Sequence, residues 1–199
     1  AIRHDVRALV RLIQERIPAP LRRWIHFSAT SYDIIHTAMM LTYRRAWQEV
    51  TSVTLTRLMD LFARMAEDHL YMRQIGRTHG QHAIPITVGF WLATILGRWM
   101  YCRGLLHETA GRLVGKFSGA VGAYNAQVLF GLTRAGETPT FEDRVLAKLG
   151  LEPAPISTQI LPPEPLMEFL HAYVLLAGVL GQIGRDCRLL ERPEIAEII

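Results

Sequence analysis

The residues best suited to chemistry lie in one polar stretch, residues 76–87, which contains two histidines and two glycines. From Arg77 to His82 it reads Arg-Thr-His-Gly-Gln-His, between two long helical patterns. A connection between helices needs only a few polar residues, whereas proton-donating and proton-accepting side chains on a loop between rigid helices are typical of an active site. The alternative is a connection whose histidines cap helix ends, and composition alone does not separate the two. Pro85 then suits the first turn of the next helix.

A second polar cluster, Thr30-Ser31-x-Asp33, comes directly before a long helical pattern. Either Thr30 or Ser31 is a natural helix N-cap, which is a complete structural explanation of the pair. The free N–H groups at a helix start also bind carboxylate or phosphate groups. The cluster therefore predicts a helix start that can hold an anion.

A run of small residues, 118–123, follows the helical pattern of residues 87–113. No predicted strand precedes it, and its glycine spacing is wrong for a dinucleotide-binding loop. It is either a tight turn between helices or a turn whose small residues let the backbone approach a ligand closely. Both interpretations place a turn here.

Three blocks of the chain occur in an order typical of a known enzyme family. Residues 77–85 resemble the Thr-His region of the adenylosuccinate lyase family, within the fumarase/aspartase superfamily. Residues 24–33 are similar to its His-x-Gly-x-Thr-Ser-x-Asp block, and residues 116–122 to its Gly-Ala-Val-Gly turn. A weaker match is His4-Asp5-Val6. These matches span nearly the whole chain, and the resemblance implies an all-α, long-helix bundle of the L-aspartase-like type.

The resemblance also implies a set of site residues. His79 corresponds to the general acid, since histidine can hold a proton near neutral pH and deliver it. The other residues that the resemblance places at the substrate are His4, Asp5, His26, Thr30, Ser31, Thr78, Gln81 and Gln159, with a turn at the site formed by Ser118, Gly119 and Gly122. It implies neither a metal ion nor an organic cofactor.

The reaction that the resemblance implies is β-elimination of fumarate from adenylosuccinate, and from succinyl-aminoimidazole-carboxamide ribotide, in purine biosynthesis. It needs a base for the Cβ proton, an acid for the departing nitrogen, and donors for the aci-carboxylate intermediate. The family's base is a serine in a Ser-Ser-x-Met-Pro-x-Lys-x-Asn-Pro loop, which the 199 residues do not contain. We therefore expect residues 1–199 to be the central helical-bundle domain, without the N-terminal domain and the C-terminal signature loop and domain, and to be poorly active alone.

Three positions depart from the family pattern. Ser28 stands where glycine is usual, and His36 stands where an aspartate is common. Residues 162–165 read Pro-Pro-Glu-Pro in place of a charged Gln-Arg-Asp pattern. These departures leave open a sibling lyase or cycloisomerase, such as argininosuccinate lyase, fumarase or a carboxymuconate cycloisomerase. A non-catalytic helical oligomer of the same fold is a further alternative.

Apolar residues at three- and four-residue intervals predict the elements that position these blocks. The expected helices are residues 2–16, 32–70, 87–113, 138–150 and 166–191, without strand alternation. At about 1.5 Å per residue the second helix would be almost 60 Å long, longer than a small domain is wide. We therefore expect a bundle that extends across subunits, and the resemblance implies a homotetramer with shared active sites. The first half of the last helix is apolar nearly all round, which predicts burial on every side.

Composition bounds the remaining possibilities. Half of the residues are hydrophobic and the net charge is +4, with arginines scattered among acids. A nucleic-acid binder is therefore an unsupported alternative, whereas a positive balance suits an anionic nucleotide substrate. Cys102 and Cys187 match no metal-ligand spacing and are expected to be free thiols. The chain starts with charged residues rather than a signal peptide, and the apolar run 169–184 is shorter than the ~20 residues of a membrane span, so we expect a soluble cytoplasmic protein.

Overall fold

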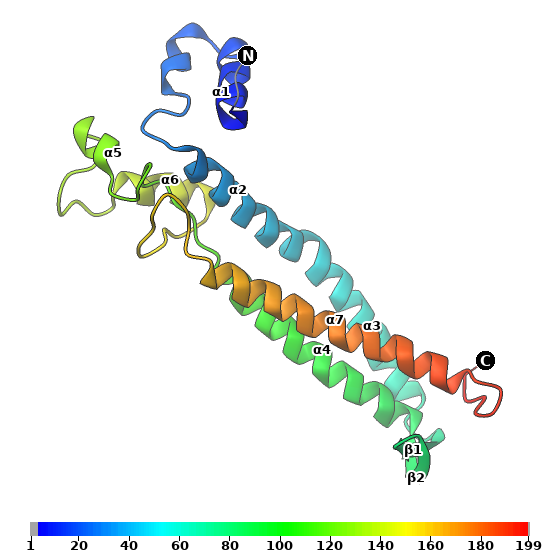
Figure 1. The fold of residues 1–199 in the computed structure, drawn as a ribbon. Helices are drawn as coiled ribbons and strands as arrows, with labels where there is room; N and C mark the ends of the chain where they lie inside the picture. The colour runs from blue at the N-terminus through cyan, green and yellow to red at the C-terminus, as the bar shows by residue number, and fades with distance from the viewer. Residues whose placement is uncertain (1–3, 199) are drawn as a thin grey trace. The chain divides into compact units, whose positions relative to one another are not determined.

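The computed structural model describes residues 4–198 and is mostly helical (Figure 1). The chain divides into two compact units. Unit 1 consists of the residues up to Arg44 together with Arg112–Leu166, and unit 2 of Arg45–Gly111 together with the residues from Met167 onward. The expected all-α fold class is confirmed, apart from one β-hairpin in unit 2.

Unit 1 is made of short helices joined by ordered turns. They are α1 (Asp5–Arg16), the 3-10 helix η1 (Ala19–Trp24), most of α2 (Ser31–Arg45), α5 (Asn125–Leu129) and α6 (Phe141–Leu149). Its apolar core is small and includes Met40, Leu113 and Leu146. Several polar side chains are buried beside it, which is unusual for a unit of this size.

Local signals explain where the helices of unit 1 begin and end. Thr140 and Asp143 form a capping box at the start of α6, and Gly150 ends this helix in the left-handed conformation. The helix predicted for residues 138–150 is therefore confirmed. His4 is the N-cap of α1, and the expected start of that helix at Ile2 lies outside the described residues.

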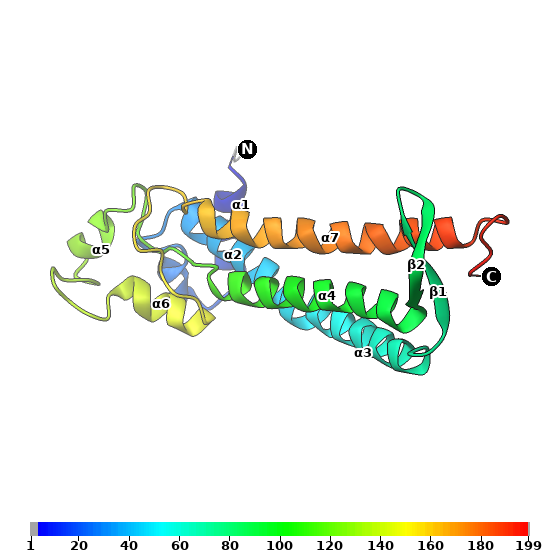
Figure 2. The same cartoon turned by 90° about the horizontal axis from the view of Figure 1, so that it is seen from below.

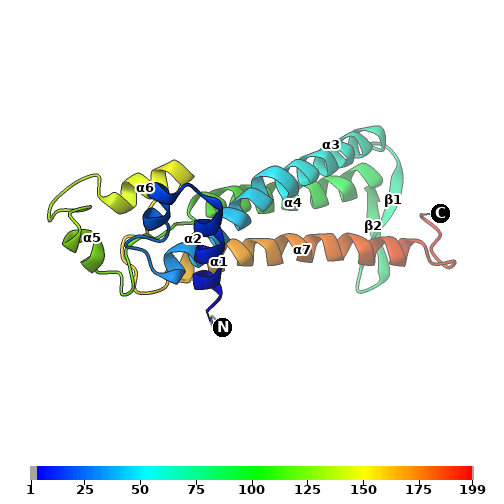
Figure 3. The same ribbon diagram turned by 90° about the horizontal axis from the view of Figure 1, so that it is seen from above.

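Unit 2 is built on three helices that run side by side, α3 (Ser52–Asp68), α4 (Val88–Gly111) and most of α7 (Glu164–Leu190) (Figure 2, Figure 3). Trp99 of α4 is fully buried, and its ring centroid lies 4.5 Å from that of Phe62 on α3. On α7, the Tyr173 hydroxyl donates a hydrogen bond to Thr51 Oγ1 at 3.1 Å. These contacts hold the three helices around one apolar seam.

The helix predicted for residues 32–70 is observed from Ser31 to Asp68, but it is not a uniform α-helix. Between α2 and α3 lies a π-helical segment, η2 (Ala46–Thr51). Trp47 in this segment is buried, with its ring centroid 6.4 Å from that of Tyr173. A π-helical turn changes which face of a helix its side chains occupy, so the segment aims Trp47 into the core of unit 2.

The polar stretch predicted to be a loop is a β-hairpin. Strands β1 (Arg73–Thr78) and β2 (Gln81–Thr87) pair antiparallel, with Thr78 opposite Gln81. The two-residue turn His79-Gly80 has φ values of 54° and 73°, as a type I′ hairpin turn requires. Pro85, expected to open the next helix, lies in β2; a two-stranded sheet has only edges, where proline is tolerated.

Helix α4 begins after this hairpin, at Val88. Thr87 Oγ1 accepts a hydrogen bond from Phe90 N at 3.0 Å and so caps the helix start. A Cβ on Gly89 would lie 2.4 Å from Ala66 O, so only glycine lets α4 cross the end of α3 this closely. The hairpin is thereby fixed at the end of the helix bundle of unit 2.

Helix α7 is not buried on every side within the single chain, and the expected burial at the centre of an oligomer stays a prediction. Met167 and Val174 are 51% and 67% exposed in the single chain. By length and composition alone α7 could also cross a membrane, because the helix is longer than the apolar run of residues 169–184. Of its most apolar window, 22% is buried within the structure. The core helix of a soluble protein passes the same test.

Candidate active site

The predicted site residues fall into two groups, one in each unit. Those of unit 1 are His4, Asp5, His26, Thr30, Ser31, Ser118, Gly119, Gly122 and Gln159. Those of unit 2 are Thr78, His79 and Gln81, at the end of the hairpin.

In unit 1, four of the predicted residues line one cavity of about 350 Å³. They are His4, His26, Thr30 and Ser31, joined there by Arg7 and Arg11. His4 Nδ1 accepts a hydrogen bond from Arg7 N at 3.4 Å. Asp5 is not part of the cavity: its side chain is 86% exposed, and its carboxylate accepts from Val6 N at 2.8 Å. The cavity therefore combines cationic side chains with the start of α2, a setting that favours an anion.

The segment before α2 is held in an unusual backbone conformation. His26 and Ser28 have φ values of 64° and 58°, a left-handed conformation that residues with a Cβ rarely adopt. Glycine at position 28 would adopt it without strain. The Ser28 hydroxyl is buried and has no hydrogen-bond partner within the described part of the chain. The departure at Ser28 therefore places a serine in a backbone conformation that glycine would adopt more easily.

Asp33, the last residue of the Thr-Ser-x-Asp cluster, is buried and collects four donors. Its Oδ2 accepts from Thr30 N at 2.8 Å and from Gly119 N at 3.1 Å. Its Oδ1 accepts from Ser118 N at 3.2 Å and from the ammonium group of Lys116. One carboxylate thus binds two of the sequence blocks that the resemblance placed at the site.

The small-residue turn packs against the segment that precedes Gln159. Ser118 Oγ lies 2.8 Å from Ser157 Oγ. A Cβ on Gly122, where φ is 76°, would lie 2.1 Å from Ser157 O. Close backbone approach is therefore required at Gly122, in contact with this chain's own residues. Gln159 is exposed, two residues beyond that contact.

A second buried carboxylate, Glu142 of α6, holds the other side of this turn. It accepts from Phe117 N at 2.6 Å and from the Tyr124 hydroxyl at 2.5 Å. Burial, and then the hydrogen bond to Glu142, raise the pKa of Tyr124 well above its usual value of 10.0. Tyr124 therefore stays protonated and donates to Glu142 near neutral pH.

Two of the departures from the family pattern meet at one contact. His36 Nδ1 accepts a hydrogen bond from Leu161 N at 3.1 Å, directly before the Pro162–Pro165 segment. Burial, and then the nearby Lys116 charge, lower the pKa of His36 below 6.5. A neutral imidazole can accept this bond, so His36 holds the proline-rich segment on α2 instead of adding a carboxylate there.

In unit 2, Thr78, His79 and Gln81 are exposed around the hairpin turn. Strand β1 of the hairpin is held by Glu197, whose Oε1 accepts from Arg77 Nη2 at 2.6 Å and whose Oε2 accepts from Gln74 Nε2 at 3.0 Å. The hydrogen bond from Arg77 is the main cause that lowers the pKa of Glu197, and the same bond raises the pKa of Arg77.

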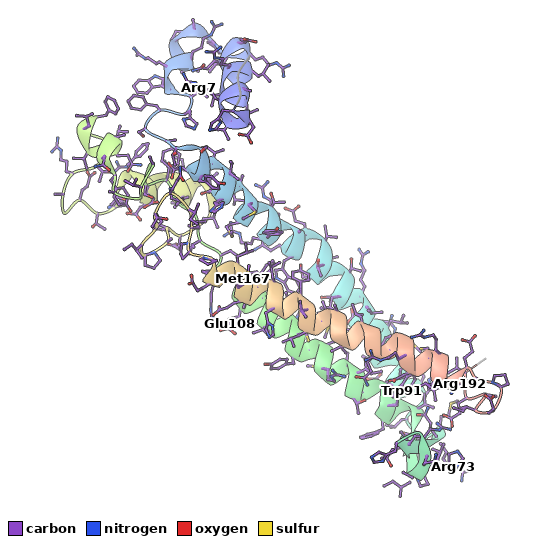
Figure 4. The ribbon with its side chains drawn as sticks, in the orientation of Figure 1. Arg7, Arg73, Trp91, Glu108, Met167 and Arg192 are labelled. Carbon is purple, nitrogen blue, oxygen red and sulfur yellow. The ribbon has the colours of Figure 1, made fainter. Side chains whose placement is uncertain are left out.

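A cavity of about 410 Å³ in unit 2 is lined by Gln74 and Arg77, the two residues that bind Glu197. Arg77 and Gly80 of the hairpin, Trp91 of α4, Asp186 of α7 and Arg192 after it all contribute to its lining. In Figure 4, Arg73, Trp91 and Arg192 are labelled at this end of the unit. The indole of Trp91 donates to Asp186 Oδ2 at 3.3 Å, which fixes α4 on α7 next to the hairpin.

Sequence reasoning missed the residues that hold the site together. Lys116, Glu142 and Glu197 were given no role, although each bonds a block that was singled out. For Lys116 a signal existed, because it is one of only two lysines in a chain whose other basic side chains, histidines aside, are arginines. Glu142 and Glu197 look like ordinary helix-start and surface acids in the sequence.

Comparison with solved structures defines the class of the fold. The chain matches the 3-carboxy-cis,cis-muconate lactonizing enzyme of Pseudomonas putida with a TM-score of 0.79 and 32% identity, covering 96% of this chain and 41% of that one. It matches a fumarate lyase from Mesorhizobium sp. BNC1 with a TM-score of 0.83 and 26% identity, covering 94% and 42%. The fold is therefore that of the helical fumarase/aspartase superfamily.

Sequence comparison narrows this class. The model of a family described as lyase matches residues 3–199, and the chain belongs to this family. Adenylosuccinate lyases from Archaeoglobus fulgidus, Bacillus subtilis and Methanocaldococcus jannaschii are 37%, 35% and 36% identical over 98–100% of this chain. The chain spans 41–43% of the length of these relatives.

Proposed function

We propose that residues 1–199 act as the central helical part of an adenylosuccinate lyase, which splits adenylosuccinate into AMP and fumarate. The observation that carries this proposal is the 35–37% identity to adenylosuccinate lyases over essentially the whole chain. By the same reasoning the related succinyl-aminoimidazole-carboxamide ribotide is a second substrate. The chemistry is elimination: a base removes the Cβ proton, the carbon–nitrogen bond breaks, and an acid protonates the departing nitrogen.

In this proposal His79 is the acid. Its position at an exposed two-residue turn lets the imidazole reach a ligand, while the paired strands fix the turn beneath it. Thr78 and Gln81 on either side supply hydrogen-bonding groups. A histidine can carry and release a proton near neutral pH, which suits protonation of a leaving nitrogen.

The residues of unit 1 are proposed to hold the anionic parts of the substrate. The first N–H groups of α2 have no partners within the helix, and the hydroxyls of Thr30 and Ser31 lie beside them in the 350 Å³ cavity. His4 and His26 line the same cavity and would add hydrogen bonds or charge near a phosphate. Gln159 would contact the substrate from the segment that packs on the turn. Asp5 lies outside this cavity.

The proton-abstracting base is proposed to come from outside residues 1–199. The family's serine signature is not among these residues. The proposal therefore assigns to this chain the acid and the substrate-holding groups, with a separate segment, of the same or another subunit, supplying the base. Residues 1–199 alone should then release fumarate far more slowly than the full-length protein.

The test is fumarate release from adenylosuccinate by the full-length protein. His79→Gln should lower kcat by about 100- to 10,000-fold, the range typical of a lost general acid. His107→Gln, at an exposed position of α4, is the matched control and should leave kcat unchanged. Wild-type turnover of adenylosuccinate by the His79→Gln variant would contradict the assignment.

We also propose that the protein assembles as a homotetramer and works in the cytoplasm. The support is the apolar surface left exposed on the helices of unit 2, including Phe90 and Met100 of α4 and Val174 and Leu180 of α7. Neighbouring subunits would cover these side chains, so α7 would be a core helix of an assembly rather than a membrane span. A native mass of four chains, in the soluble fraction without detergent, is the expected result.

A second candidate is a sibling activity of the same superfamily. It is favoured by the 32% identity to the muconate lactonizing enzyme and by the departure at His36, which contacts Leu161. Comparing kcat/KM for adenylosuccinate, argininosuccinate, fumarate (in hydration) and 3-carboxymuconate in one preparation separates adenylosuccinate lyase from the sibling activities. Substrate binding with no turnover in the full-length protein would instead favour a non-catalytic helical oligomer.

A further inference from the structure

The most completely buried charges of unit 1 form one ion pair. The side chains of Asp33 and Lys116 are both 0% exposed, and the ammonium group of Lys116 donates to Asp33 Oδ1. Both residues also bind backbone of the turn, because Lys116 Nζ donates to Gly119 O at 3.2 Å and Asp33 accepts from Ser118 N and Gly119 N. The pair is therefore part of a network rather than an isolated contact.

This network joins two segments that are separated by more than 80 residues. Asp33 Oδ2 accepts simultaneously from Thr30 N, before α2, and from Gly119 N, in the turn. Lys116 is itself fixed by Thr37 of α2, whose hydroxyl accepts from Lys116 N at 3.0 Å and donates to Lys116 O at 2.9 Å. A shift of the turn relative to α2 would break several of these bonds together.

Stability alone does not account for such a pair. Removing two charges from water costs several kilocalories per mole, and replacing a buried pair by neutral side chains of similar size is often neutral for stability. What the pair supplies is a defined relative position, because a carboxylate with four donors accepts only one geometry.

We infer that Asp33 and Lys116 are positioning residues of the substrate site: together they set the distance between the start of α2, with Thr30 and Ser31, and the turn from Ser118 to Gly122. The inference rests on the proposed function for its substrate. It assigns to neither residue a contact with the substrate, since the Asp33 oxygens are already occupied by donors of the chain.

The test compares single and double variants of the full-length protein. Asp33→Asn and Lys116→Met each leave one buried partner unsatisfied, and both should lower the thermal midpoint of unfolding. The double variant removes both charges and should recover most of that midpoint. Its kcat/KM for adenylosuccinate should nevertheless stay about 100-fold below wild type, mainly through KM, as expected for misplaced binding groups. A double variant with wild-type KM would overturn the inference.

Two further variants keep the test decisive if Asp33→Asn does not fold. Asp33→Glu preserves the charge but moves the carboxylate by one methylene, so it should fold and still raise KM; an unchanged KM would count against positioning. Glu137→Gln is the matched control, because it breaks the exposed pair with Arg144 in the same unit and should change neither quantity.

Amide hydrogen exchange separates this inference from the proposed function. In the double variant, the amides of Thr30, Ser118 and Gly119 should exchange faster than in the wild type, whatever the substrate. A wild-type protein that does not cleave adenylosuccinate refutes the proposed function, and these three amides then decide the role of the pair alone. Unchanged exchange at all three would refute the positioning role.

Discussion

Two ion pairs hold the chemistry-bearing backbone of this protein, and they differ in their surroundings. In unit 1, Asp33 and Lys116 are fully buried, and most of their other partners are backbone groups. In unit 2, Arg77 and Glu197 are 18% and 23% exposed, with 2.6 Å between Arg77 Nη2 and Glu197 Oε1. The first pair links the start of α2, which borders the cavity of unit 1, to the turn of residues 118–122; the second links a hairpin to the end of the described chain.

The difference teaches how the predicted site residues of each unit can respond to their surroundings. A buried carboxylate with four donors is insulated from salt and solvent, so the start of α2 and the turn keep one arrangement. An ion pair in contact with water is weaker, and water can replace its hydrogen bonds more easily. We therefore expect the substrate-holding residues of unit 1 to be rigid and the hairpin that carries His79 to be adjustable.

The largest expected effect comes from breaking the buried pair on one side. Lys116→Met leaves the Asp33 carboxylate buried without its counter-charge, which should cost about 3–5 kcal/mol of unfolding free energy. Arg77→Met, in the partly exposed pair, should cost about 1 kcal/mol or less. Denaturant unfolding of the full-length protein and both variants measures the two values. Equal losses would mean that burial does not distinguish the pairs.

The next effect concerns the turn that the buried pair holds. Gly122→Ala places a Cβ 2.1 Å from Ser157 O, in a backbone with φ of 76°. The clash and the left-handed backbone together should destabilise the protein by about 2 kcal/mol or more. Gly119→Ala is the matched control, because its φ is 86° but its nearest neighbour would lie 4.0 Å away.

Gly119→Ala should therefore show only the backbone cost, about 1 kcal/mol. Comparing the unfolding free energies of the two variants isolates the contact with Ser157. If both variants lost the same stability, the packing of the turn on that segment would not matter.

The parts of this fold that follow from short-range rules could be predicted from sequence. The helix from Thr140 to Gly150 was predictable because its cap and its stop are encoded within a few residues of each end. The start of α2 after Thr30 was predictable for the same reason. The positions of Thr78, His79 and Gln81 on one exposed segment also followed, although that segment was taken for a loop.

The remaining features depend on contacts that sequence spacing does not show. The hairpin was missed because its strands carry few alternating apolar residues and its turn, His79-Gly80, is not one of the strong hairpin dipeptides. The Asp33–Lys116 pair joins residues 83 positions apart, and a helical sequence pattern gives no sign of it. The exposure of Val174 likewise depends on what packs on α7 rather than on its composition.

A stabilising substitution tests how tightly the cavity edge is held. Ser28→Gly removes the cost of a left-handed serine and a buried hydroxyl without a partner among the described residues. It should raise the unfolding free energy by about 1 kcal/mol. If the segment is positioned by Asp33 and its donors, KM for adenylosuccinate should not change. A gain in stability with an increased KM would mean that the strain at Ser28 itself shapes the cavity.

The smallest expected effect is the pH dependence of the Arg77–Glu197 pair, which holds the hairpin. The pKa of Glu197 is lowered from 4.5, chiefly by the hydrogen bond from Arg77. A carboxyl whose pKa is lower in the folded state stabilises the fold above its unfolded pKa, and this contribution disappears as pH falls through the folded pKa. Glu197→Gln should therefore be less stable than wild type at pH 7, by about 1 kcal/mol or less, and the difference should vanish below pH 4.5.

Amide hydrogen exchange in β1 and β2, measured from pH 7 to below pH 4.5, reports directly on the Arg77–Glu197 ion pair. If the wild type stayed more stable than Glu197→Gln well below pH 4.5, Glu197 would hold the hairpin without its charge. The expected difference between the Arg77–Glu197 and Asp33–Lys116 pairs would then be wrong.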